Sequence, residues 1–61
     1  MNPRLLVLDD DAAILSLLQR YCDGIGWRVQ GCTEMPEGLR LVETHHFEAV
    51  ICDLHLGAGP E

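Results

Sequence analysis

The chain has 61 residues, of which 48% are hydrophobic and 23% charged, and its net charge is −6. These values argue against a disordered chain and allow at most one small domain. The negative charge, carried with four arginines and no lysine, also argues against a surface that binds nucleic acid. No apolar run approaches the ~20 residues of a membrane-spanning helix, and the N-terminus does not resemble a signal peptide, so we expect a cytoplasmic protein.

The cysteines and histidines show no metal-binding spacing. The cysteines are odd in number and contain no CxxC pair, which indicates neither a disulfide framework nor a zinc site. We expect the cysteines to be small buried side chains in a reducing compartment, and the histidines to end a helix and to lie in a loop. These residues are Cys22, Cys32, Cys52, His45, His46 and His55.

The first half of the chain predicts a strand, a helix and a second strand. Residues 4–9, RLLVLD, form a short apolar run typical of a strand that is buried on both faces. Residues 11–24 follow a helical period, with Asp11 suited to cap the helix and Gly24 suited to end it. Residues 27–32, WRVQGC, predict the second strand. The apolar stripe of the helix consists of Ile14, Leu17, Leu18, Tyr21 and Cys22.

The second half predicts another helix and a third strand. Thr33 is suited to cap this helix, Pro36 is tolerated in its first turn, and Gly38 weakens it. Residues 47–53, FEAVICD, predict the third strand, which a loop follows. Alternating strands and helices imply a parallel sheet that helices cover. The apolar stripe of the second helix consists of Met35, Leu39 and Val42.

Two apolar strands run directly into aspartate, in LLVLDDD at residues 5–11 and in AVICDLHL at residues 49–56. If the strand order is 2-1-3, the first and third strands are neighbours, and their carboxyl ends meet at one edge where such sheets bind ligands. We therefore expect Asp9, Asp10 and Asp53 to converge. A lone aspartate at a strand end is commonly a helix cap, but two such ends favour a site. Proteins tolerate clustered carboxylates when a cation lies among them or when one acid stays protonated. Mg²⁺ prefers such oxygen ligands, so the pattern suggests a magnesium site.

These motifs, with the helix AAILSLLQRYCDGIG and the strand WRVQGC between them, resemble the receiver domain of bacterial two-component response regulators. The resemblance implies a flavodoxin-like α/β fold with a doubly wound parallel sheet in the order 2-1-3. It covers about the first half of such a domain, so residues 1–61 would be the N-terminal part of a single receiver, truncated after the third strand. The hydroxyl residue and the lysine that respond to the phosphoryl group in this family would then lie beyond Glu61.

The resemblance implies a phosphoacceptor in two-component signal transduction rather than an enzyme. Asp53 would accept a phosphoryl group from a sensor histidine kinase or a phosphotransfer protein, with Mg²⁺ as the cofactor. Asp10 and Asp53 would hold the ion, Asp9 would assist through water, and the backbone carbonyl of His55 would complete the protein ligands. Gly57 stands where the family usually has proline, which leaves the shape of the following loop open. No contact with nucleic acid or a membrane is expected of this segment.

Two other functions are compatible with parts of the sequence. DDDAA, residues 9–13, partly matches the DxDx(T/V) motif of haloacid-dehalogenase-type phosphatases, in which Asp9 would be the nucleophile and Asp11 the general acid. However, Ala13 occupies the Thr/Val position, and that motif does not account for Asp53. A third alternative is a receiver-like domain that binds a partner without being phosphorylated.

The third strand also predicts an unprotected sheet edge. Residues 49–52 are apolar throughout and contain none of the charges, prolines or bulges that protect natural edge strands. In the order 2-1-3 this strand has only one neighbour, so we expect dimerisation or strand swapping through it.

Overall fold

A computed structural model of the chain describes residues 2–53. Within them, three strands form one parallel sheet in the order β2-β1-β3, which confirms the expected strand order and a partial flavodoxin-like α/β fold. Neither helix has the length and apolar character needed to cross a membrane. The elements are β1 (Arg4–Leu8), α1 (Ala12–Gly24), β2 (Arg28–Cys32), α2 (Met35–Thr44) and β3 (Ala49–Cys52).

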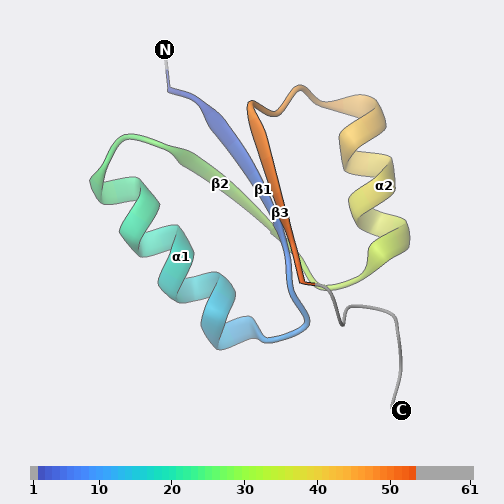
Figure 1. Ribbon diagram of the computed structural model, residues 1–61, viewed down its shortest axis with the longest axis horizontal. Coiled ribbons are helices and arrows are strands. Elements are labelled where there is room, and N and C mark those ends of the chain that lie inside the picture. Colours follow the sequence, from blue (N-terminus) through green and yellow to red (C-terminus); the bar gives the residue numbers. More distant parts are fainter. Residues whose placement is uncertain (1, 54–61) are drawn as a thin grey trace.

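The central strand, β1, is apolar on both faces, and this is why it lies between the other two. Leu6 and Val7 are its most deeply buried residues, at 0% and 1% exposure. Leu5 and Val7 face α1, whereas Leu6 and Leu8 face α2, and Figure 1 shows the two helices on opposite sides of the sheet. Burying side chains of this size contributes about 1.5–3 kcal/mol each, so most of the stability depends on this strand.

The first helix, α1, begins and ends close to the predicted positions. The Asp11 carboxylate accepts hydrogen bonds from the backbone N–H groups of Ala13 and Ile14, at 2.9 and 3.4 Å, which confirms it as the N-cap. Gly24 is the last helical residue. Gly26 follows with φ at 90°, a conformation that glycine adopts without steric cost, and the chain then turns into β2.

The inward face of α1 differs from the predicted stripe. Leu15 and Cys22 are buried, while Leu17 and Tyr21 are exposed. The predicted stripe was therefore right for Cys22 and for Leu18, which packs against the core, and wrong for its exposed members. It missed Leu15 because apolar residues occur on more than one face of this helix, so the period of 3.6 residues does not determine which face turns inward.

The second helix, α2, corrects two further predictions. Its N-cap is Glu34 rather than Thr33, and no side chain caps it by a hydrogen bond. Leu39 is 58% exposed, whereas Gly38 is buried against β1. A Cβ atom at Gly38 would overlap the Leu8 side chain, so this glycine permits close packing of the helix on the sheet. From the sequence, we predicted only that Gly38 weakens the helix through its poor helix propensity. Met35 and Leu41 complete this contact, and Val42 joins Leu39 on the exposed side.

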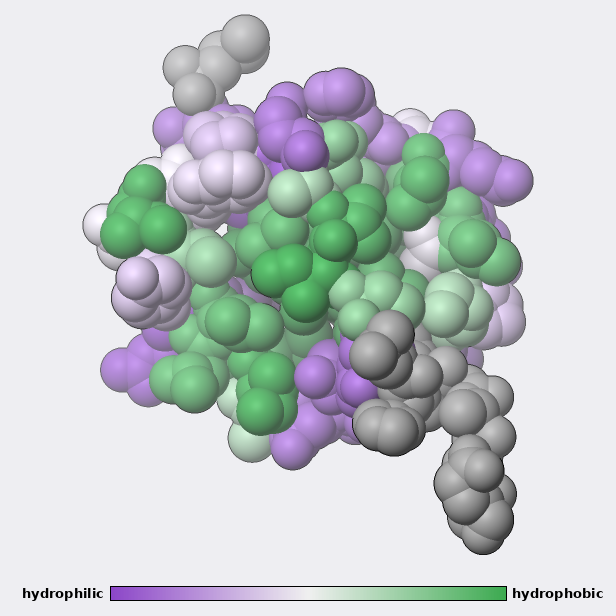
Figure 2. Space-filling model, in the orientation of Figure 1, coloured by the Kyte–Doolittle hydropathy of each residue, from purple (hydrophilic) through white to green (hydrophobic). Residues whose placement is uncertain are grey.

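The third strand, β3, pairs with β1 and with no other part of residues 2–53. Val50 and Ile51 are each 49% exposed, and Cys52 is exposed as well. The expectation that all three cysteines are buried is therefore wrong for Cys52, because nothing in the described part of the chain covers the outer side of β3. Figure 2 shows a hydrophobic patch in the middle of this face, between the two helices.

Candidate metal centre at the carboxyl edge of the sheet

The register of the sheet places two aspartates side by side. Leu8 of β1 pairs with Cys52 of β3, so Asp9 and Asp53 follow at the same level of the sheet. The Asp9 N–H donates to the Cys32 carbonyl at 3.0 Å, and the Asp53 N–H donates to the Leu8 carbonyl at 2.9 Å. These hydrogen bonds extend both ladders by one residue and fix the backbone of each aspartate at the carboxyl edge.

Three carboxylates meet at this edge. Each of Asp9, Asp10 and Asp53 offers a carboxylate oxygen, and these oxygens all lie within 4.8 Å of one another. Asp9 and Asp53 are half-buried and Asp10 is exposed. The predicted convergence of the three acids is confirmed. The fourth ligand expected from the sequence, the carbonyl of His55, lies outside the described residues.

The third acid of the DDD run, Asp11, has a different task. Its side chain caps α1, and its N–H donates to the Asp9 carboxylate at 2.9 Å. In the turn from β1 into α1, the Asp11 N–H thus orients the Asp9 side chain, while the Asp11 side chain caps the helix. This division explains why only two of the three consecutive acids join Asp53.

The electrostatics of this edge favour a cation. Two unit charges 4 Å apart repel each other by about 1 kcal/mol in water, and by more where solvent is partly excluded. The N-terminus of α1 offsets some of this repulsion, because the aligned peptide dipoles of the helix place partial positive charge there. Carboxylate oxygens on an open, wet edge are the ligands that suit Mg²⁺, which retains several of its waters when bound. The residues present therefore fit this ion.

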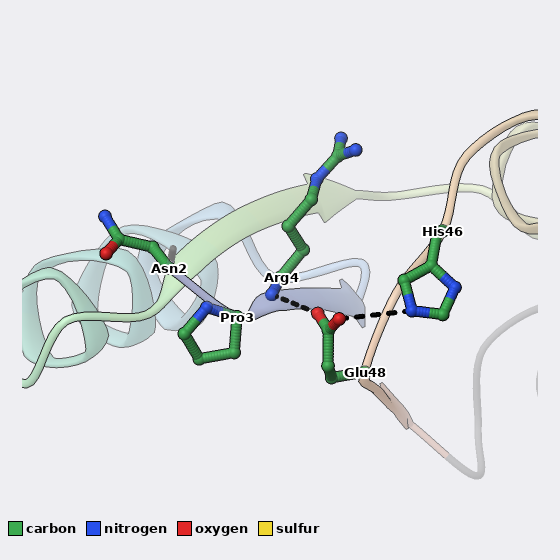
Figure 3. A pocket seen from close by; sticks show the side chains of 5 residues that line it. All are labelled: Asn2, Pro3, Arg4, His46 and Glu48. Carbon is green, nitrogen blue, oxygen red and sulfur yellow. Dashed lines mark hydrogen bonds and ion pairs between the residues drawn. The ribbon is translucent and has the colours of Figure 1, made fainter.

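The opposite, amino-terminal edge of the sheet also gathers charged groups, which the sequence did not single out (Figure 3). The Glu48 carboxylate accepts a hydrogen bond from the Arg4 N–H at 2.6 Å and lies 3.1 Å from His46 Nε2. The hydrogen bond from the Arg4 backbone lowers the pKa of Glu48 below its ordinary value of 4.5. The strand register accounts for this contact, because Arg4 and Glu48 immediately precede the paired residues Leu5 and Ala49.

Comparisons with known protein families, with curated proteins and with solved structures find no match to this chain. Roles for the acidic residues therefore depend on their geometry and chemistry, together with the motifs in the sequence.

Proposed function

We propose that this chain is a phosphoacceptor of the two-component receiver type, with Asp53 as the residue that accepts the phosphoryl group. The observation that supports the proposal is the convergence of Asp9, Asp10 and Asp53 at the carboxyl ends of two neighbouring parallel strands. This edge is where open α/β sheets bind ligands. Under the same proposal, residues 1–61 are the N-terminal part of a single receiver domain.

The chemistry follows from the residue types. A carboxylate oxygen of Asp53 would attack the phosphorus of a phosphohistidine on the kinase or phosphotransfer partner, and the phosphorus–nitrogen bond would break. The imidazole leaves with the electron pair and takes up a proton from solvent, and Asp53 keeps the phosphoryl group as an acyl phosphate. Mg²⁺ bound by the three aspartates would neutralise charge on the phosphoryl oxygens. Asp53 is the acceptor that the resemblance to receiver domains implies, and the hydrogen bond to Leu8 holds its backbone at this edge.

The phosphatase alternative is weakened by the position of Asp11. A general acid has to present its carboxyl group to the leaving group, yet this carboxylate accepts hydrogen bonds from two N–H groups at the start of α1. The phosphatase alternative also assigns no role to Asp53. A receiver-like domain that is never phosphorylated would not need three acids brought together at one edge, because mutual repulsion destabilises them without a cation.

The proposal is tested by incubating the chain with a small phosphodonor, such as acetyl phosphate or phosphoramidate, in the presence of Mg²⁺. We expect one phosphoryl group per chain by intact mass, stable in acid and labile in base, and mapped to Asp53 after cleavage. Asp53→Asn should abolish the modification.

Asp11→Asn is the matched control. Asparagine caps helices as well as aspartate does, so this variant keeps the fold and removes only the acid. It should be modified like the parent. Phosphate on Asp9, loss of modification in Asp11→Asn, or no modification of the parent would each refute the proposal.

A further inference from the structure

Two arginines lie side by side at the amino-terminal edge of the sheet. The strand register pairs Arg4 of β1 with Arg28 of β2, and paired residues of neighbouring strands lie about 4.8 Å apart with their side chains on the same face. That face is the α2 side, because the Arg4 guanidinium lies 5.2 Å from the centre of the Phe47 ring, which packs in the core on that side. Two of the four arginines of the chain therefore meet at one place, although the net charge is −6.

Neither guanidinium is neutralised within the described part of the chain. In residues 2–53, no ion pair involves Arg4 or Arg28. The Glu48 carboxylate instead contacts the Arg4 backbone N–H and His46, and Figure 3 shows the Arg4 guanidinium directed away from that carboxylate. Like charges opposite each other on neighbouring strands repel and destabilise the pair. An anion that binds both guanidiniums would remove this repulsion.

A hollow lies beside the two arginines. It has a volume of about 340 Å³ and is lined by Arg4, Arg28, Val29 and Gln30. It lies at β2, the edge of the sheet opposite β3, and at the other end of the strands from Asp53. The contact with the Phe47 ring restrains the Arg4 side chain, so less conformational freedom is lost when this guanidinium binds a ligand.

The chemistry of this hollow favours a phosphate group. A guanidinium donates two parallel N–H groups to an oxyanion, and two neighbouring guanidiniums offer two such forks. A carboxylate has two oxygens and occupies one fork, whereas a phosphate group has at least three and can accept from both. A phosphate group also carries nearly two negative charges at neutral pH, which balance the two cations. Because the chain as a whole is acidic, a small ligand suits this hollow better than a polyanion.

We propose that Arg4 and Arg28 bind the phosphate group of a small molecule, either inorganic phosphate or a phosphate ester. Each guanidinium donates to different oxygens of the same phosphate group. Arg28 is exposed and Arg4 half-buried, so solvent screens the interaction and the affinity should be in the millimolar range. The site lies at the opposite end of the sheet from the three aspartates, and the proposal does not depend on phosphorylation of Asp53.

The first test is a titration of the metal-free chain with inorganic phosphate, followed in a proton–nitrogen NMR spectrum at constant pH and ionic strength. Removal of divalent ions prevents phosphate from binding through a metal ion at the carboxyl edge. We expect saturable shifts of the amide signals of Arg4, Arg28 and Gln30, with those of Asp9 and Asp53 unchanged. Acetate should bind more weakly, because it has only two oxygens.

The same titration with methyl phosphate distinguishes the two sources of the phosphate group. Tighter binding of methyl phosphate would identify an ester as the ligand, whereas equal or weaker binding would identify inorganic phosphate. Both results support the site, because both probes present the same group to the two guanidiniums.

The second test uses variants at Arg28. Arg28→Gln should weaken phosphate binding about fivefold, the upper range for one exposed ion pair. Arg28→Lys should bind more tightly than Arg28→Gln but less tightly than the parent, since an ammonium group keeps the charge and loses the fork. Arg20→Gln is the matched control, because it removes the same charge from α1, on the other side of the sheet, and it should bind like the parent. Circular dichroism checks that all three variants fold.

The proposal fails if phosphate leaves the signals of Arg4 and Arg28 unchanged, or if acetate binds as tightly as phosphate. It also fails if Arg28→Gln binds phosphate like the parent, or if Arg20→Gln loses as much affinity as Arg28→Gln. None of these measurements involves a phosphodonor or Mg²⁺, so their outcome is independent of the proposed function of Asp53.

Discussion

At the amino-terminal edge of the sheet, the Glu48 carboxylate accepts a hydrogen bond from the Arg4 N–H and lies 3.1 Å from His46 Nε2. At the carboxyl edge, the oxygens of three aspartates lie within 4.8 Å of one another. At the amino-terminal edge, the Glu48 carboxylate has local partners, and its hydrogen bond joins the start of β1 to the start of β3. The carboxyl edge concentrates like charge, which costs stability unless an ion binds. The Glu48 contacts therefore act in folding, and the three aspartates are the better candidate for function.

Both edges of the sheet include an end of β1. We therefore expect the largest effect on the free energy of unfolding from a substitution at a buried residue of this strand. Leu6→Ala removes a side chain that is fully buried in the centre of β1 and should cost about 2–5 kcal/mol of the free energy of unfolding. For a domain of this size that loss approaches the whole stability. Urea denaturation followed by circular dichroism measures it. Leu17→Ala, on the exposed side of α1, should change the free energy by no more than ~0.5 kcal/mol. Equal effects of the two variants would show that β1 is not the core.

A smaller effect is expected where α2 packs beside the carboxyl edge. Gly38→Ala forces a methyl group against Leu8, the last residue of β1 before the acids, and should destabilise the chain by about 1–2 kcal/mol after its gain in helix propensity. Gly24→Ala is the control, because Gly24 is helical and its added methyl would contact nothing. It should be neutral or stabilising by up to ~1 kcal/mol. Thermal unfolding of both variants makes the comparison, and a stabilising Gly38→Ala would contradict the close packing.

The charge repulsion at the carboxyl edge predicts a stabilising substitution. Asp10→Asn removes one like charge from the cluster and should raise the free energy of unfolding by up to ~1 kcal/mol without divalent ions at low salt. Added salt should reduce this gain, and Mg²⁺ should stabilise the parent more than the variant. Glu48→Gln at the other edge should have the opposite sign, because it weakens a local pair. If Asp10→Asn is destabilising without divalent ions, the carboxylates do not repel as described.

The amino-terminal edge predicts a small dependence on pH. The hydrogen bond from Arg4 lowers the pKa of Glu48 in the folded chain, so this residue stabilises the fold fully above its ordinary value of 4.5. That contribution is lost as the pH falls through the lowered pKa of the folded state. The melting temperatures of the parent and Glu48→Gln should therefore differ most near neutral pH and converge in acid. A difference in melting temperature that grows as the pH falls would contradict a lowered pKa of Glu48 in the folded chain.

The sequence predicted the features that depend on local pattern and topology. The order of elements, the Asp11 cap and the meeting of Asp9 with Asp53 follow from hydrophobic runs, cap chemistry and the parallel arrangement of the strands. Each of these needs only the identity of residues close in sequence, plus one rule of sheet topology.

The sequence failed where the outcome depends on packing between distant residues. The inward face of α1 could not be read from a helix with apolar residues on several faces, and Leu15 was overlooked for that reason. The need for glycine at position 38 arises from its close approach to Leu8, which no local sequence pattern encodes. The exposure of Cys52 depends on what lies beside β3, and the apolar strand by itself suggested burial.

The most direct test of the central claim is a Mg²⁺ titration followed in a proton–nitrogen NMR spectrum, with Na⁺ at equal ionic strength as the control. The account predicts saturable shifts of the amide signals of Asp9, Asp10 and Asp53, with Arg4 and Glu48 unchanged. Asp10→Ala should remain folded and lose the response. Unchanged signals at millimolar Mg²⁺, equal shifts at both edges of the sheet, or an undiminished response in Asp10→Ala would contradict a metal centre at the carboxyl edge.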